Sequence, residues 1–314
     1  IMYFPYLRGR QYELIAIREL IQKEKLSSYV IPIIEPVKLS STLSNTIGIC
    51  EEKNNSIAFV VNPQVGSLYA DARKDKTGKK LNDLFTMVIQ SKNVIKAIIA
   101  GNDSELKVND LLSNGIDMNE IMSIYLDREG ISDYEMLFNK SAMYNVIPYD
   151  MAFRRIREKR ILLFDRFEAI KKERNNDYAK KEDEFFSDDH LYYNTDGYLG
   201  FSDYSIVGHD YQETGFAPYA VAIHVVYFDE EKNLRIRHFV SDSNDDISDP
   251  AKKFYEAVTK LVKWNSKMHL DTEGIKMFEE LHRTGAYPGL GVVKKLSIMH
   301  HLQLMGEYLE ENTI

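Results

Sequence analysis

Residues 30–62, VIPIIEPVKLSSTLSNTIGICEEKNNSIAFVVN, contain the pattern that decides the fold. Two short apolar runs, residues 30–37 and 57–62, flank an amphipathic segment at residues 41–52. Apolar runs that do not alternate with polar residues are typical of parallel strands covered on both faces. The segment therefore predicts a strand, a helix and a second, parallel strand.

The same strand–helix unit recurs along the first two thirds of the chain. Further strands are predicted at residues 3–7, 94–100, 121–126, 144–149, 160–164 and 201–207. The remaining helices are predicted at residues 10–24, 82–90, 105–114, 132–140, 151–158 and 167–181. Eight such units with right-handed crossovers close into an α/β fold of the (β/α)8 TIM-like barrel type. An open, doubly wound parallel sheet is the alternative architecture.

The last third of the chain has a different pattern. Two antiparallel strands are predicted at residues 219–229 and 233–241, and helices at residues 250–264, 272–283 and 289–310. No linker separates residues 211–314 from the barrel at residues 1–210, so we expect a β-hairpin and helical cap packed on the barrel as one domain. Within the hairpin, His224 and His238 are predicted to face each other, with Asp242 nearby, although a strand histidine is usually structural.

Composition limits the class of protein. The formal net charge is -8 and the pI about 5.6, which argues against a protein that coats duplex DNA. The single cysteine, Cys50, cannot form an internal disulfide. No stretch approaches the roughly 18 apolar residues that a membrane helix needs, and residues 1–10 do not read as a signal peptide. We therefore expect a cytoplasmic protein without a membrane span.

Polar side chains follow nearly every predicted strand, at the end where barrel enzymes build their sites. The acidic residues at these ends are Glu35, Asp127, Asp150, Asp165 and Asp203. The basic and amide residues are Arg8, Arg10, Gln11, Lys38, Asn62, Asn102 and Arg128. If the barrel closes, side chains from both groups meet at a single mouth.

Clustered carboxylates repel each other unless a divalent cation offsets them or they pair with basic side chains, namely Arg8, Arg10, Lys38 and Arg128. The predicted ligands of such a cation, Mg²⁺ or Mn²⁺, are Glu35, Asp127, Asp165 and Asp203. The predicted contacts to a phosphate-containing substrate are Arg8, Arg10, Gln11, Lys38, Asn62 and Arg128. His209 or His190 would act as acid and base. The alternative is that each acid only caps the following helix, which the positions of Asp150 and Asp165 favour.

Two further segments carry candidate binding residues. Residues 63–80 form a long connection with a basic set, namely Arg73, Lys74, Lys76, Lys79 and Lys80. This connection is interpreted either as a cationic lid over a phosphate or as a solvated loop. Residues 185–208 combine aromatic side chains with Asp188, Asp189 and His190, which suits base or sugar stacking, or a packed surface loop.

Several strings resemble an uncharacterised bacterial family, namely YFPYLRGRQYELIAIREL, IPIIEPVK, FVVNPQVG, FSDDH, GFSDYSIVG, AVAIHVVYF and RHFVSD. The opening YxPYLRGKQ motif and the PIIEPVK strand are also distantly similar to the phage-type Beta protein family; Arg10 stands where that motif has lysine. The resemblance covers nearly the whole chain and implies a bacterial or prophage origin, a neighbouring partner gene and a role in phage defence. It supports a set of motif positions without roles: Arg8, Gln11, Glu13, Glu35, Lys38 and Asn62.

Three functions remain open from the sequence. The first is metal-assisted hydrolysis of a phosphodiester or phosphate ester at the barrel mouth. The second is a non-catalytic binding or regulatory component of a two-gene system, in which the cap meets a protein partner. The third is binding of single-stranded nucleic acid through the basic connection and the aromatic residues, which the net acidity disfavours.

Overall fold

Eight parallel strands form a nearly closed barrel in the computed structural model, which describes residues 2–75, 78–101, 103–174, 177–213, 215 and 217–313. Their order around the barrel is β1-β2-β3-β4-β5-β6-β7-β9. The bounds are β1 Tyr6–Arg8, β2 Ile33–Glu35, β3 Ile57–Val60, β4 Val94–Ile99, β5 Ile121–Ile124, β6 Tyr144–Pro148, β7 Arg160–Leu163 and β9 Gly200–Ser202. The predicted TIM-like barrel is therefore confirmed, with an eighth strand shorter than predicted.

The barrel closes where the chain before β1 meets β9. Tyr3 and Phe201 form a parallel bridge, and the amide of Phe4 donates to the carbonyl of Phe201 at 2.9 Å. Gly200 permits this approach, because a Cβ there would lie 2.5 Å from the carbonyl oxygen of Met2. The seam thus depends on a residue without a side chain.

Side chains of the barrel strands alternate between two apolar layers. Tyr6 and Ile33 belong to the cluster that fills the barrel interior. Leu7 and Ile34, one residue later in each strand, belong to the larger cluster beneath the helices. Because the side-chain period of a strand is two residues, Arg8 and Glu35 point inward again, at the mouth.

The barrel helices follow the predicted order, with two differences. Their bounds are α1 Gln11–Gln22, α2 Ser41–Lys53, α3 Leu68–Lys74, α4 Lys79–Gln90, α5 Ser104–Ser113, α6 Asp133–Met136 and α7 Arg166–Arg174, with 3-10 turns η1 Met118–Glu120, η2 Arg128–Ser132, η3 Met151–Phe153 and η4 Tyr178–Lys180. The helix predicted at residues 151–158 is wrong, because only Phe153 and Ile156 find core there and the chain makes only the turn η3. The connection at residues 63–80 contains α3, which buries Leu68 and Ala72.

The cap is a three-stranded antiparallel sheet covered by helices. Its elements are β8 Asp183–Ser187, α8 Asp189–Tyr192, β10 Ala222–Phe228, β11 Leu234–Val240, α9 Pro250–Met268, α10 Glu273–Thr284 and α11 Leu290–Glu311. The hairpin β10–β11 and its three helices match the sequence prediction, whereas β8, which pairs with β11, was not predicted.

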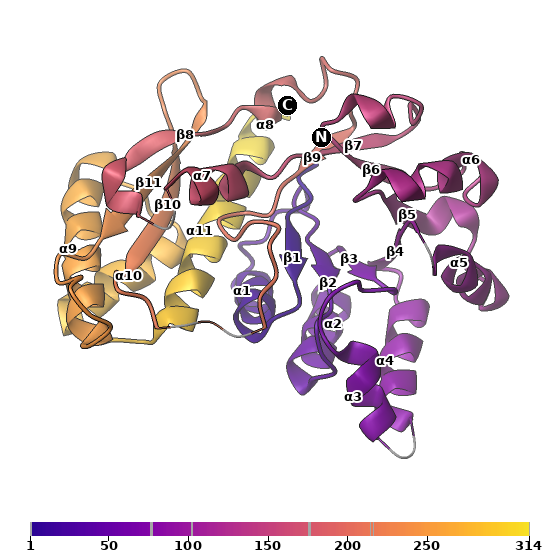
Figure 1. The fold of residues 1–314 in the computed structure, drawn as a ribbon, viewed down its shortest axis with the longest axis horizontal. Helices are drawn as coiled ribbons and strands as arrows, with labels where there is room; N and C mark the ends of the chain where they lie inside the picture. Colours follow the sequence, from indigo (N-terminus) through magenta and orange to yellow (C-terminus); the bar gives the residue numbers. More distant parts are fainter. Residues whose placement is uncertain are drawn as a thin grey trace.

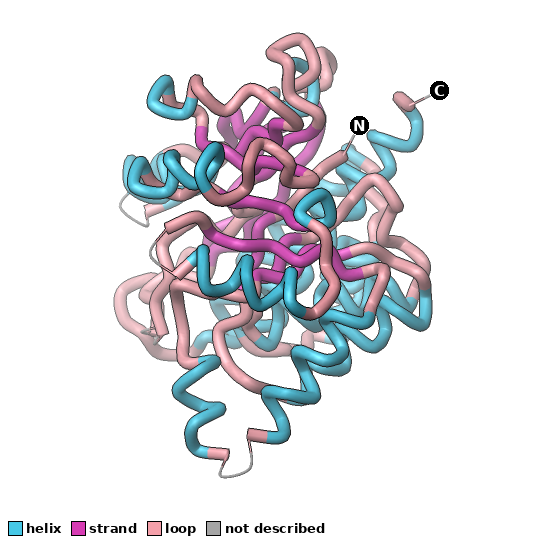
Figure 2. Tube along the Cα trace, turned by 90° about the vertical axis from the view of Figure 1, so that its right-hand side faces the viewer, coloured by secondary structure: helices cyan, strands magenta, loops and turns pink. Residues whose placement is uncertain are grey.

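The cap packs along one side of the barrel. Helix α11 contacts α1, α10 and β10 and so joins the two parts (Figure 1). In the view turned by 90°, the strands lie in the middle of the molecule with helices around them (Figure 2). No helix in the described ranges is long and apolar enough to cross a membrane.

Candidate functional site

A cavity of about 490 Å³, the mouth cavity, lies at the carboxyl ends of β1 to β5 and beside the loop after β9. Arg8, Glu35, Asp127 and His209 all line it, so four of the predicted site residues do meet there. The basic residues Arg73, Lys74, Lys79 and Lys80 are not among its lining residues, and Lys76 and Asn102 lie outside the described residues.

Glu35 and Arg8 form the buried base of the mouth cavity. The carboxylate of Glu35 is fully buried and accepts from Arg8, from the Tyr6 hydroxyl at 2.7 Å and from the Gln64 amide at 2.7 Å. Arg8 also donates to the carbonyl of His209 at 2.8 Å, which ties the loop after β9 to β1. Both side chains are therefore held by the protein itself.

Three more of the predicted residues make structural contacts. Two of them bond nearby backbone, and the third forms an ion pair on the rim of the barrel. Asn62 is fully buried and bonds both the amide and the carbonyl of Ile99, which joins β3 to β4. Asp127 caps η2 through the amides of Glu129 and Gly130. Arg128 pairs with Asp150 at 3.6 Å on the exposed rim.

Asp165 has two backbone roles. It caps the start of α7 through the amides of Phe167 and Glu168, at 3.1 and 3.0 Å. Its second oxygen accepts from the amide of His209 at 2.6 Å. The alternative hypothesis, in which Asp165 caps the following helix, therefore agrees with its contacts.

Other predicted residues lie away from the mouth cavity. Asp203 accepts from the hydroxyl of Tyr3 and the amide of Ser205, between the barrel and α11. His190 bonds the carbonyl of Lys232 and packs among rings of the cap. Gln11 and Lys38 are exposed. Of the four predicted metal ligands, Glu35 and Asp127 line the mouth cavity and Asp165 and Asp203 do not. No group of three His, Cys, Asp or Glu side chains in the described part of the chain could hold a metal ion.

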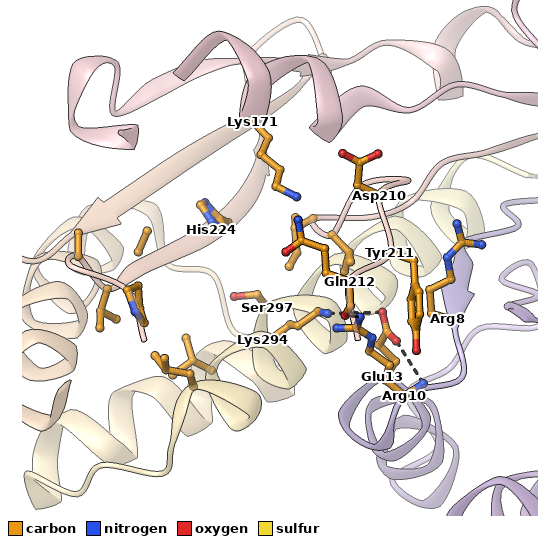
Figure 3. Close-up of a pocket in the computed structure, with 18 residues that line it drawn as sticks. Arg8, Arg10, Glu13, Lys171, Asp210, Tyr211, Gln212, His224, Lys294 and Ser297 are labelled. Atoms are coloured by element: carbon orange, nitrogen blue, oxygen red, sulfur yellow. Dashed lines mark hydrogen bonds and ion pairs between the residues drawn. The ribbon is translucent and has the colours of Figure 1, made fainter. Parts of the chain in front are cut away.

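A second cavity of about 350 Å³, the barrel–cap cavity, lies behind the loop that follows β9 (Figure 3). Arg8, Asp210 and Tyr211 line both cavities, so this loop separates them. Its cationic lining comes from distant parts of the chain and consists of Arg8, Arg10, Lys171 and Lys294. Arg10 is held by the carbonyl of Gln212 and by the ring of Tyr211, whose centroid is 4.5 Å from the guanidinium carbon.

The carboxyl groups beside these cations are poorly solvated. Glu13 is buried, and burial raises its pKa although Lys294 lies 3.7 Å away. Burial and the neighbouring carboxyl group of Asp210 also raise the pKa of Glu168, which lies 3.9 Å from Lys171. When these carboxyl groups take up protons at low pH, Lys171 and Lys294 keep a positive charge that Glu168 and Glu13 no longer balance.

The predicted pairing of His224 and His238 is confirmed. The two residues are opposite each other in the β10–β11 register, and their Nδ1 atoms lie 2.8 Å apart. His224 lines the barrel–cap cavity. Asp242 instead pairs with Lys260 at 2.7 Å.

Three residues of the barrel–cap cavity were not predicted from the sequence, namely Lys171, Lys294 and Asp210. Lys171 lies on the charged helix α7, whose sequence looks like an ordinary solvated surface, and Lys294 lies beside Lys295 on the largely apolar helix α11. A signal was available only for Asp210, which directly follows the candidate His209.

Comparisons of the chain with protein-family models, with curated proteins and with solved structures find no match.

Proposed function

We propose that this protein binds a phosphate-bearing ligand in the barrel–cap cavity. The observation that carries the proposal is the convergence of Arg10, Lys171 and Lys294, from three distant segments, on one cavity that Arg8 also lines. A phosphate group offers several strong acceptor oxygens, so cations that approach from different directions can each contact a different oxygen. The volume of about 350 Å³ suits a small ligand.

Of the four basic side chains that line the cavity, Lys171 and Lys294 are held less firmly than Arg8 and Arg10. Arg8 is buried and bonded to Glu35, and Arg10 is held by the loop after β9. Among the described residues, the ion-pair contacts of Lys171 and Lys294 are longer, at 3.9 Å to Glu168 and 3.7 Å to Glu13. An incoming phosphate would therefore compete with weak ion pairs for these two ammonium groups.

Adjacent lysines provide matched controls. Lys172 also lies 3.9 Å from Glu168, but its side chain is 71% exposed and it does not line the cavity. Lys295 pairs with Glu19 at 2.9 Å and does not line the cavity either. Each control removes one positive charge from the same helix as its test variant.

Calorimetric titration with inorganic phosphate tests the proposal. We expect Lys171→Gln and Lys294→Gln each to weaken binding by about tenfold or more, the value of one charge-assisted hydrogen bond. Lys172→Gln and Lys295→Gln should bind as the parent does. No phosphate binding by the parent, or equal losses in the controls, would overturn the proposal.

Treatment with a chelator addresses the Mg²⁺ or Mn²⁺ predicted from the sequence. Binding by the four basic side chains requires no metal ion, so phosphate affinity should be the same before and after treatment with EDTA. A large loss of phosphate affinity after EDTA that is reversed by added Mn²⁺ would show that a metal ion takes part in binding, and it would contradict the proposal in this form.

A further inference from the structure

A chain of buried hydrogen bonds leads from Arg174 to the wall of the barrel–cap cavity. Arg174 donates to Glu184 from Nη2 at 2.7 Å and from Nε at 3.3 Å. Glu184 lies 2.9 Å from Nε2 of His238, and Nδ1 of His238 lies 2.8 Å from Nδ1 of His224. The four residues come from α7, β8, β11 and β10, so the cap sheet and the last barrel helix build the chain jointly.

The order of donors and acceptors along this chain determines which ring nitrogen of His238 and of His224 carries the hydrogen. A carboxylate only accepts hydrogen bonds, so Nε2 of His238 carries a hydrogen and donates to Glu184. In a neutral imidazole, Nδ1 of His238 then accepts, and Nδ1 of His224 must donate to it. This leaves Nε2 of His224, on the residue that lines the cavity, as a hydrogen-bond acceptor.

The surroundings hold His224 in this state. The rings of Tyr178 and Phe167 pack against it in edge geometry, with centroids at 4.5 and 5.1 Å. Burial and the neighbouring His238 lower the pKa of His224 well below its ordinary value. Although burial opposes it, hydrogen bonds from Arg174 and His238 lower the pKa of Glu184, which keeps this carboxylate ionised.

The cavity places charge opposite this acceptor. Lys171 reaches from α7 into the same cavity, and Asp210 lies beyond it on the loop after β9 (Figure 3). Lys294 and Ser297 line the cavity from α11. Among the described residues, the titratable groups packed against His224 are Tyr178 and His238. The charged side chains that line the cavity with it are Arg8, Arg10, Glu13, Lys171, Asp210 and Lys294.

We propose that His224 is the catalytic base of a phosphodiester hydrolase whose substrate occupies the barrel–cap cavity, with His238 and Glu184 as positioning residues. This inference rests on the proposed phosphate binding. A diester is favoured over a monoester because it carries a single negative charge, and both cavity lysines are already partly balanced by Glu13 and Glu168.

The step balances without an oxidant, a reductant or a further reactant. Nε2 of His224 accepts a proton from water as the water oxygen forms a bond to phosphorus. The bond from phosphorus to the leaving oxygen breaks, and the leaving alkoxide takes a proton from solvent water. The proton on His224 then passes to the hydroxide left in the solvent, which restores the neutral imidazole. The products are an alcohol and a phosphate monoester.

Lys171 and Lys294 would stabilise the charge that builds on the non-bridging oxygens in the transition state. Burial disfavours the imidazolium that forms on His224, and the negative charge of Glu184, acting through His238, would oppose this effect.

Release of 4-nitrophenolate from bis(4-nitrophenyl) phosphate tests the inference, with phosphate binding measured in parallel. His224→Asn keeps a donor near the Nδ1 position but has no atom at Nε2. We expect turnover to fall by about 100-fold or more, the usual contribution of a general base, while phosphate affinity stays within a few fold. His282→Asn is the control, because His282 stacks on Tyr255 outside the cavity and should turn over like the parent.

The outcomes separate the two proposals. Phosphate binding without hydrolysis of the diester by the parent would overturn the role of His224 and leave the binding proposal standing. Absence of phosphate binding would overturn both. Hydrolysis of 4-nitrophenyl phosphate but not of the diester would overturn the assignment of the substrate class.

The positioning role has its own readout. Glu184→Gln keeps the hydrogen bond to His238 but removes the negative charge that favours a protonated relay. We expect the acid limb of the pH–rate profile to move to lower pH, because the imidazolium loses stabilisation. A lower rate with an unmoved acid limb in folded protein, checked by circular dichroism, would reduce Glu184 to a structural residue.

Discussion

Arg8 and Glu35 are directly paired in the register of β1 and β2, and their side chains form an ion pair that the barrel buries almost completely. The pair stands at the mouth cavity, and Arg8 also reaches the barrel–cap cavity. A buried charge without its partner is far more costly than an exposed one.

We therefore predict that Glu35→Gln destabilises the protein. The variant keeps one oxygen that can accept from the backbone amide of Gln64, but it places an NH2 donor where Oε2 accepts from Arg8 and leaves that guanidinium without a countercharge. The free energy of unfolding should fall by about 3–5 kcal/mol, and Arg8→Met combined with Glu35→Leu should recover much of that loss. Urea denaturation of the three proteins measures this. Parent-like stability of Glu35→Gln would contradict the prediction.

Stability should depend on the protonation of Asp203, whose pKa burial raises to about 7. An unfolded aspartate titrates near about 3.9, so between these values the folded protein binds more protons than the unfolded chain. The free energy of unfolding should then fall as the pH rises from about 4 to about 7, and level off above. Asp203→Asn keeps an acceptor for Tyr3 and Ser205 and should remove this slope.

The measurement is thermal or urea unfolding at several pH values. Above about pH 7, Asp203→Asn should be more stable than the parent by about 2–4 kcal/mol, because the parent must then ionise a buried carboxyl group whose pKa is raised. A variant that is less stable than the parent at pH 8 would show that the ionised carboxylate is favoured by Tyr3 and Ser205 after all.

Anion affinity should rise as the pH falls, because the raised pKa of Glu13 lets it lose its charge beside Lys294, Arg10 and Arg8. Sulfate is the suitable probe, since its own charge is constant between about pH 5 and pH 8. In Glu13→Gln the negative charge is absent at every pH, so affinity at pH 8 should increase by a few fold and its pH dependence should shrink. Calorimetry with sulfate measures both. An unchanged pH dependence would exclude Glu13 as its source.

Two helical glycines should respond in opposite directions to alanine. A Cβ on Gly274 of α10 would lie 2.3 Å from the carbonyl oxygen of Leu296, so Gly274→Ala must push α10 away from α11. We expect it to lower the free energy of unfolding by about 1–3 kcal/mol. A Cβ on Gly48 of α2 would meet nothing within 4 Å, so Gly48→Ala should stabilise by up to about 1 kcal/mol. Equal effects in chemical denaturation would contradict the close packing of α10 and α11.

The strand pattern was readable from the sequence because it depends on local periodicity. Runs such as residues 57–62 are apolar on both faces wherever they occur in a parallel barrel, so the count and order of strands followed from them. The segment of β8 lacks this signal, since Glu184 and Phe185 alternate in burial and the strand pairs only with distant β11. Glu184 therefore could not be predicted as a partner of His238.

The barrel, its mouth with Arg8 and Glu35, and the facing pair His224 and His238 were determined by the sequence itself, because period, register and turn position are properties of neighbouring residues. Only the tertiary structure decided that Lys171 and Lys294 line the same cavity as Arg10, and that Asp203 lies away from the mouth cavity. Those relationships depend on how α7 and α11 pack against the barrel, and such packing sums many weak contacts between segments far apart in the chain.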